Sequence, residues 1–206
     1  MNILRRFSIC GLGVLLVSVP CWAGRGPDRS DSAAAAAKAS IAALSDAERA
    51  ELKAFTDRVK DYINMEKNLP ADKLSPKKDV AQLEQQRKAL RDALQQARPN
   101  AKQGDIFTPE SAAVFRKLLK ATITGPAGPK IRASLRHAEP IGPQDLKVNG
   151  VYPNVHGQPM QSVPPTLLLN LPVLPKGIEY RITDHTVALR DSDANMIVDY
   201  LPDALP

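Results

Sequence analysis

Residues 179–200 read EYRITDHTVALRDSDANMIVDY, and apolar side chains alternate with polar ones in three short segments of this run. A period of two places alternate side chains on opposite faces of a strand. Asp184-His185 and residues 191–195 separate the segments, and both separators are rich in turn-forming residues. The pattern predicts a three-stranded antiparallel meander. We expect its buried face to carry Tyr180, Ile182, Val187, Leu189, Met196, Val198 and Tyr200, and its other face to carry Glu179, Arg181, Arg190 and Asp199.

A sheet of three short strands is marginally stable unless its apolar face is covered. The run just before the meander, residues 166–175, contains five leucines and a valine. It is too apolar for a free linker, so we expect it to form a strap that packs on the meander. The strap and the meander together make up a C-terminal module of residues 166–206.

Proline sets the structure of the preceding segment, because twelve of the 18 prolines lie between Pro126 and Pro206. Each proline removes a backbone donor and fixes φ, which excludes a long helix or an inner strand. We therefore expect residues 125–165 to form an extended, Pro-rich connector.

Residues 45–124 show the helical period instead. Ser45 and Glu48 match a capping box, and apolar residues follow it at spacings of three and four. A second amphipathic segment is expected to begin at Ser75, and a third begins at Thr108 with Pro109 in its first turn. The predicted fold class is α+β, with an N-terminal antiparallel helical hairpin or three-helix bundle, the connector and the meander.

The N-terminus reads as an export signal in residues 1–23. Arg5 and Arg6 precede the apolar run Phe7–Val19, which is too short to cross a membrane, and Cys21-Trp22-Ala23 offers a small-residue cleavage site. We expect cleavage after Ala23, a periplasmic or secreted product, and no transmembrane segment after cleavage. Lipidation at Cys21 is the alternative, but Pro20 is a poor residue before a lipidated cysteine. Residues 24–44 are rich in alanine without a broad apolar stripe, so we expect a mobile arm there.

The mature chain differs in chemistry from the precursor. Both cysteines lie in the signal, so disulfide and thiolate chemistry are excluded after cleavage. Loss of Arg5 and Arg6 lowers the formal net charge from +6 to +4, and basic and acidic residues are interleaved. This pattern gives no indication of a nucleic-acid-binding surface.

Two parts of the chain resemble known families. The segment RPNAKQGDIFTP, residues 98–109, together with the motifs LPVLP, EYR, LRD and AN-x-IVD of residues 171–199, resembles small exported bacterial proteins of uncharacterised function. That resemblance implies export and names no activity. The C-terminal thirty residues also show a weaker similarity to periplasmic proteins of nickel and cobalt homeostasis, which implies an accessory role in metal handling.

Candidate metal ligands are sparse. Asp191, Asp193 and Asn195 alternate like the start of a calcium loop, but Met196 replaces the required Gly and Pro202 the required Glu. We favour a turn between strands. His156 and His185 lack a paired spacing, although a site assembled by the fold from His156, His185 and Asp184 stays open. The candidate metal residues are thus His156, His185, Asp191 and Asp193, and no cofactor is predicted.

Catalytic signatures are absent from the sequence: it has no Gly-x-Ser-x-Gly motif and no glycine-rich phosphate loop. The leading hypothesis is an exported cell-envelope protein that acts as a non-catalytic binding or accessory module, with an envelope protein as its partner. The alternatives are a periplasmic metal-homeostasis accessory protein and an envelope hydrolase with a site not readable from sequence. The oligomeric state is open.

Overall fold

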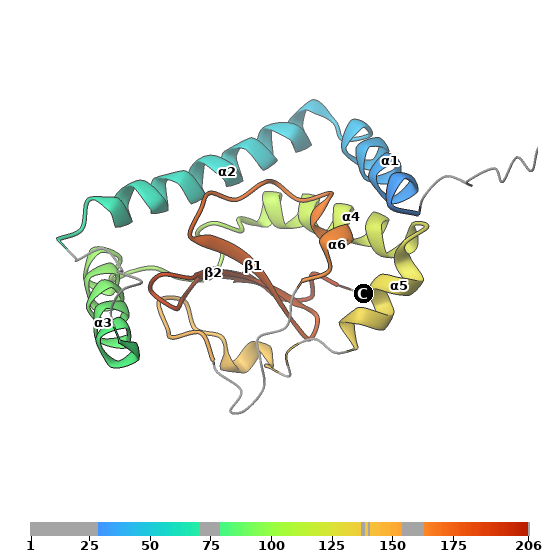
Figure 1. Cartoon of the computed structure of the whole chain (residues 1–206). Coiled ribbons are helices and arrows are strands. Elements are labelled where there is room, and N and C mark those ends of the chain that lie inside the picture. Colours follow the sequence, from blue (N-terminus) through green and yellow to red (C-terminus); the bar gives the residue numbers. More distant parts are fainter. Residues whose placement is uncertain (1–28, 71–78, 137–138, 140, 154–162, 206) are drawn as a thin grey trace, which may run out of the picture.

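The computed structural model describes residues 29–70, 79–136, 139, 141–153 and 163–205, and Figure 1 shows their arrangement. Helices precede a three-stranded antiparallel sheet with strand order β1-β2-β3. This confirms the α+β class and the meander. The elements are α1 (Arg29–Ala42), α2 (Asp46–Lys67), α3 (Val80–Ala97), α4 (Pro109–Thr124), α5 (Gly128–Leu135), a short 3-10 turn (Pro143–Asp145), α6 (Pro165–Leu168), β1 (Ile178–Thr183), β2 (Thr186–Asp191) and β3 (Met196–Leu201).

The helix starts follow the capping residues. Ser45 Oγ accepts from the Glu48 N–H at 3.1 Å, and the Glu48 carboxylate accepts from the Ser45 N–H at 2.7 Å, which confirms the predicted capping box. Thr108 caps α4, and Pro109 occupies its first turn. Asp79 caps α3, whereas the start expected at Ser75 lies outside the described residues.

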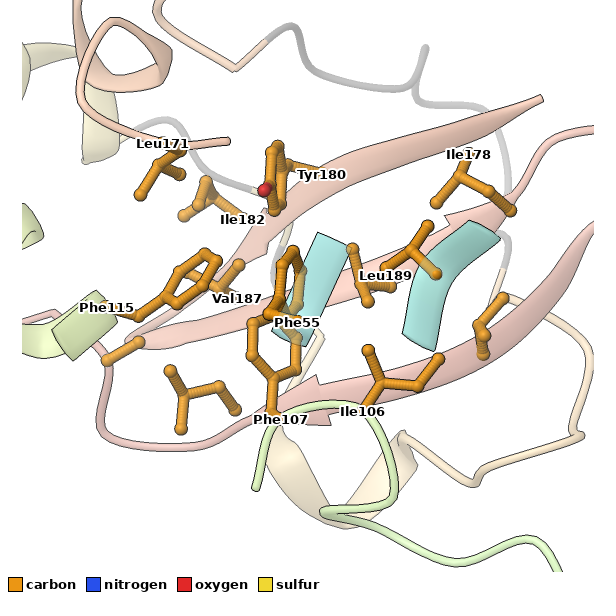
Figure 2. Close-up of a cluster of buried hydrophobic side chains, with 14 of the residues drawn as sticks. Phe55, Ile106, Phe107, Phe115, Leu171, Ile178, Tyr180, Ile182, Val187 and Leu189 are labelled. Carbon is orange, nitrogen blue, oxygen red and sulfur yellow. The ribbon is translucent and has the colours of Figure 1, made fainter. Parts of the chain in front are cut away.

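One face of the sheet packs against the helices. The rings of Phe55, Phe107 and Phe115 lie over the strands, with neighbouring ring centroids 4.6–5.1 Å apart (Figure 2). α2 and α4 contact each other, and their buried side chains continue into the same core as Leu90 and Leu94 of α3. The helices thus share a core with the sheet.

A β-bulge corrects one predicted face. The pairing between β2 and β3 shifts between Leu189 and Arg190, so that Leu189 pairs with Asp199 and Arg190 pairs with Ile197. The extra residue reverses the alternation that follows it. Asp199 therefore turns to the helix face, and Tyr200 packs against the opposite cluster, contrary to the sequence-based expectation.

The opposite face of the sheet is covered as well. Ala188 and Ile197 pack there with Ile141, Leu146 and Tyr152 from the Pro-rich segment. The backbone of this segment also pairs with the outer edge of β3, because Ile197 exchanges hydrogen bonds with Asn149 and Gly150 at 2.9 Å. The prediction of an extended connector over residues 125–165 is wrong in part, because α5 is helical with Pro129 in its first turn, where no donor is needed.

The N-terminal arm also differs from expectation. Residues 29–42 form α1, which contacts α4 and α6 and buries Ala33 and Ala37. We expected no packing because the stripe is narrow, but alanine lets two helix backbones approach closely. The signal sequence lies outside the described residues. None of the described helices is both long enough and apolar enough to cross a membrane.

Candidate binding groove along β1

A groove of about 480 Å³ runs along the outer edge of β1, and we call it the β1 groove. This volume is within the range of known ligand sites. One wall is formed by Val163, Leu168 and strap residues 171–174, and the other wall by residues 178–181 of β1. Figure 1 shows the strap passing from α6 over β1 before the chain enters that strand.

The strap is only partly buried. Leu167 and Leu171 enter the core, as expected of a strap that covers the meander. Leu168 and Leu169 are 37% and 44% exposed, and Val173 is 89% exposed. The strap therefore adds exposed apolar surface beside the groove, a feature typical of interaction sites.

β1 is an edge strand whose outer main-chain groups face the groove. In an antiparallel pair, alternate residues direct their N–H and C=O groups toward the partner strand. Gly177 lies in register with Ser192 and accepts its N–H at 2.8 Å, so Glu179 and Arg181 also bond toward β2. The N–H and C=O of Tyr180 consequently point outward, and within the described part of the chain neither has a partner across that edge.

The strap does not continue the sheet at this edge. Pro172 and Pro175 have no N–H to donate. The strap accepts two bonds instead, from the Tyr180 hydroxyl to the Pro172 carbonyl at 3.0 Å and from the Ile178 N–H to the Pro175 carbonyl at 3.2 Å. Burial raises the pKa of Tyr180 well above its usual range, so the hydroxyl stays a donor.

A buried polar cluster, formed by Glu139, Tyr152, Glu179, Arg181 and Arg190, lies on the opposite face of β1 and β2. Arg181 pairs with Glu139, which accepts from the Tyr152 hydroxyl at 2.6 Å. Arg190 pairs with Glu179 at 2.6 Å. Both guanidinium groups lie over the Tyr152 ring, at 5.7 and 5.4 Å from its centroid. Burial, together with Arg190, lowers the pKa of Arg181.

Arg181 belongs both to this cluster and to the lining of the β1 groove. Its Nε is buried and has no acceptor among the described residues. A buried donor without a partner is costly, so this position carries an energetic penalty within the cluster.

Of the predicted metal residues, Asp191 and Asp193 lie at the turn after β2. The Asp191 carboxylate accepts from the Tyr62 hydroxyl at 2.7 Å and from the N–H groups of Asp193 and Ala194 at 2.8 Å, while Asp193 is exposed. Glu66 approaches from α2. Burial and the charges of Asp191 and Asp193 raise its pKa to about 7.

Only one of the two predicted histidines lies among the described residues. His185 is exposed in the turn between β1 and β2, with Nδ1 3.2 Å from the Leu205 carbonyl oxygen. His156 lies outside the described residues. Over the described ranges no group of three or more His, Cys, Asp and Glu side chains is placed to hold a metal ion.

The RPNAKQGDIFTP segment has a structural role in the loop between α3 and α4. The Asp199 carboxylate accepts from the N–H groups of Gly104, Ile106 and Phe107 at 2.8–3.0 Å. Gly104 has a φ of +89°, which a side chain would strain. Burial raises the pKa of Asp199, and these amide donors oppose that rise.

No family model, curated protein or solved structure matches this chain. The two resemblances noted from the sequence therefore stay predictions.

Sequence reasoning did not identify the β1 groove. It treated the strap as a cover of the meander and placed Arg181 on the face of the strand opposite to the buried one. Two signals pointed to the groove: the paired prolines of LPVLP, which prevent strand pairing, and an arginine within an alternating strand whose neighbour is glutamate. Neither signal reveals that the donor of Arg181 is left unused.

Proposed function

We propose that this chain is an exported cell-envelope protein that acts without catalysis, by binding an extended segment of an envelope protein at the β1 groove. The single observation that carries the proposal is an apolar groove of about 480 Å³ bordered by the edge of β1, where the main-chain groups of Tyr180 have no partner within the described part of the chain. Exposed edge strands bind extended chains by main-chain hydrogen bonding. Val173, which lines the groove, is 89% exposed and offers an apolar contact there.

The two edges of the sheet support this choice. The β3 edge is occupied by residues 149–151 of the same chain, including a bridge between Val151 and Met196. At β1, a bridge between Glu139 and Thr183 occupies the last residue, while the main-chain N–H and C=O of Tyr180 have no partner across that edge among the described residues. An unprotected strand edge normally invites aggregation, and proline next to such an edge is one way proteins limit it. The prolines of the strap are consistent with a groove that binds a single chain, because they disfavour the repeated strand pairing that leads to aggregation.

Export is supported by the charge, apolar run and small-residue site of residues 1–23. Expression in a bacterium with a periplasm, followed by intact mass spectrometry of the periplasmic fraction, should show a chain that begins at Gly24. A soluble envelope form that begins at Met1 would refute export by a cleaved signal.

Binding is tested by placing a photo-crosslinking amino acid at Val173 in the exported protein. Val80, at 78% exposure on α3 and away from the groove, is the matched control position. We expect a discrete crosslinked envelope protein from position 173 that is lost in a Leu168→Asp background and absent at position 80. The captured protein, once purified, should bind the unmodified chain in solution. Equal crosslinking from both positions would contradict the proposal.

A further inference from the structure

The charges of the chain are mixed overall, but residues 109–136 depart from that pattern. This stretch, which forms α4 and α5, holds six basic residues and one acidic residue, Glu110. Figure 1 shows α4 leading into α5 at the end of the molecule away from α3. All six basic side chains are exposed, and we call the surface that they form the basic face: Arg116, Lys117, Lys120, Lys130, Arg132 and Arg136.

The helices on the other side of the molecule treat their basic residues differently. On α2 and α3, basic side chains pair with carboxylates three or four positions away on the same helix. Lys53 pairs with Asp57 at 2.6 Å, and Lys88 pairs with Asp92 at 2.6 Å. The positive charge of α2 and α3 is thus largely balanced within each helix.

The basic face lacks this internal balance. Among the described residues of α4 and α5, the one that pairs with a carboxylate is Lys117, which contacts Glu48 of α2 at 2.6 Å. Arg116 and Lys120 are four positions apart on α4, an arrangement in which like charges destabilise a helix. Glu110 precedes Lys120 by about 15 Å along the helix, beyond the distance of about 8 Å over which a charge is felt at physiological salt. The surface therefore keeps an unbalanced positive charge.

Main-chain acceptors hold two of the arginines in place without neutralising them. Arg132 donates to the Ile123 carbonyl at 2.7 Å and so ties α5 to the last turn of α4. Arg116 donates to the carbonyls of Pro202 and Asp203 at 2.9 and 3.1 Å. The Asp203 side chain is exposed and forms no ion pair among the described residues. Both guanidinium groups are positioned by the fold, and their charge stays available to a partner.

The lack of apolar anchors favours a membrane surface over a protein partner. Protein interfaces normally have an apolar or aromatic centre. The large apolar residues that are exposed in the described structure all lie outside α4 and α5. Phe115, the one aromatic residue of 109–136, is fully buried. A layer of anionic headgroups needs no such anchor, because it attracts clustered basic side chains by charge.

We propose that the basic face binds the anionic phospholipid headgroups of an envelope membrane by charge, without inserting side chains into the hydrocarbon. Single-stranded nucleic acid is a less suitable partner, because its bases stack on exposed aromatic side chains. Duplex nucleic acid presents phosphates as well, and the choice of a membrane over it rests on the export proposed above. The basic face is otherwise independent of the β1 groove, since none of its six residues lines that groove.

The first test measures binding of the mature protein to vesicles by co-sedimentation. One vesicle preparation is phosphatidylcholine, and the other contains phosphatidylcholine and phosphatidylglycerol in equal parts. One variant removes charges from the basic face through Lys120→Gln, Lys130→Gln and Arg136→Gln. The matched control removes as many charges from exposed positions of α2 and α3 through Lys53→Gln, Lys60→Gln and Lys88→Gln, so the two variants have the same net charge. Circular dichroism checks that both are folded.

Wild type should bind the mixed vesicles and leave phosphatidylcholine vesicles unbound. The basic-face variant should bind the mixed vesicles at least about tenfold more weakly, and the control variant less than about threefold more weakly. Binding should be lost when sodium chloride is raised from about 0.1 M to about 1 M, because the screening length falls from about 10 Å to about 3 Å.

The second test distinguishes lipid from nucleic acid in the exported protein. Membranes isolated at low salt should retain wild type and the control variant, whereas the basic-face variant should be found in the soluble envelope fraction. Treatment of the membranes with nuclease should release no wild-type protein.

Four results would each overturn the inference: equal binding to the two vesicle preparations, equal losses in the two variants, binding that survives high salt, or release from membranes by nuclease. The vesicle measurement requires neither export nor a groove ligand, so its failure leaves the proposed function intact. A chain that begins at Met1 but still binds the mixed vesicles would reject export, and with it the choice of a membrane as the partner.

Discussion

Asp199 connects the helical half of the chain to the sheet through a single carboxylate. It is fully buried, and three amides of the loop between α3 and α4 donate to it. The bulge in β3 turns this side chain toward the loop, so a backbone irregularity and a buried charge serve the same contact. Loop conformation therefore depends on one residue nearly a hundred positions away in sequence.

Replacement of Asp199 with alanine should cost about 3 kcal/mol of unfolding free energy, because three loop amides lose the carboxylate acceptor that they share. Urea unfolding followed by circular dichroism measures this change. Asp61→Ala on the exposed surface of α2 is the control and should shift the free energy by less than about 0.5 kcal/mol. Equal effects of the two substitutions would show that the amides find water instead.

Glu66 gives the molecule a dependence on pH. Burial and two aspartates raise its pKa from 4.5 to about 7, so the folded state holds this proton more tightly than the unfolded state. The resulting stabilisation is present in full below pH 4.5 and is lost as pH rises through about 7.

Glu66→Gln should therefore be more stable than wild type at pH 8. We expect a difference of about 1 kcal/mol in unfolding free energy, because the half-exposed position of Glu66 weakens the effect of its neighbours. At pH 4.5 the two proteins should be nearly equal in stability. Chemical denaturation at the two pH values measures the difference, with Glu51→Gln on the same helix as control. A Glu66→Gln variant that is less stable at pH 8 would mean that the ionised carboxylate is favourable where it lies.

Among the elements, those with a strong local period were predictable and those that depend on tertiary contact were not. The meander follows from alternation, and α2 follows from Ser45 and Glu48. The position of Tyr200 could not be predicted, because one extra residue in β3 reverses the alternation and no turn residue marks it. The cover formed by Ile141, Leu146 and Tyr152 was missed, because isolated apolar residues among prolines show no period. The β1 groove was not predicted for a related reason. One of its walls is the strap, which was expected to cover the meander, and the other is a strand whose alternation predicts one apolar and one polar face.

Leu189 lies at the centre of β2 with its side chain fully buried in the main core. Leu189→Ala should destabilise the chain by about 2 to 5 kcal/mol, through lost apolar burial and the cavity left behind. Leu169→Ala, at a 44% exposed position of the strap, is the matched deletion and should cost far less. Thermal and urea unfolding of both variants compare the two directly, and similar costs would refute a fixed register for the meander.

The docking of α1 relies on small side chains. Ala37 is buried against α4 and α6, whereas Ala35 on the same helix is exposed. Ala37→Leu should separate the helices and cost about 1 to 3 kcal/mol locally, while Ala35→Leu should be tolerated. Hydrogen exchange of the α1 amides measures the effect. Unchanged protection in Ala37→Leu would indicate that the helix forms without this contact.

At the scale of the whole molecule, both faces of a three-stranded sheet are buried by segments that come before it in sequence. The helices and the loop between α3 and α4 cover one face through three phenylalanines, and the Pro-rich segment covers the other through Tyr152 and its neighbours. The helical region and the C-terminal module, which sequence composition separates sharply, thus share a core. Of the two edges of the sheet, β3 is paired with residues 149–151, whereas the main-chain groups of Tyr180 on β1 have no partner across that edge among the described residues.

The shared core makes a definite prediction about fragments. In a fragment of residues 45–124, the rings of Phe55, Phe107 and Phe115 would lose the strands on which they lie. Phe115 would also lose its contact with the Tyr180 ring, whose centroid is 6.2 Å away. The loop amides would lose their acceptor, Asp199. Amphipathic helices without a partner for their apolar face are marginal in water. We therefore expect poor amide dispersion in the NMR spectrum of this fragment. The mature chain from residue 24 should instead give a dispersed spectrum. Its unfolding should show a single transition by both far-ultraviolet circular dichroism and tyrosine absorbance. A fragment with a dispersed spectrum and cooperative melting would show that the helices form an independent bundle, in which case the sheet and its groove would be a separate module resting on it.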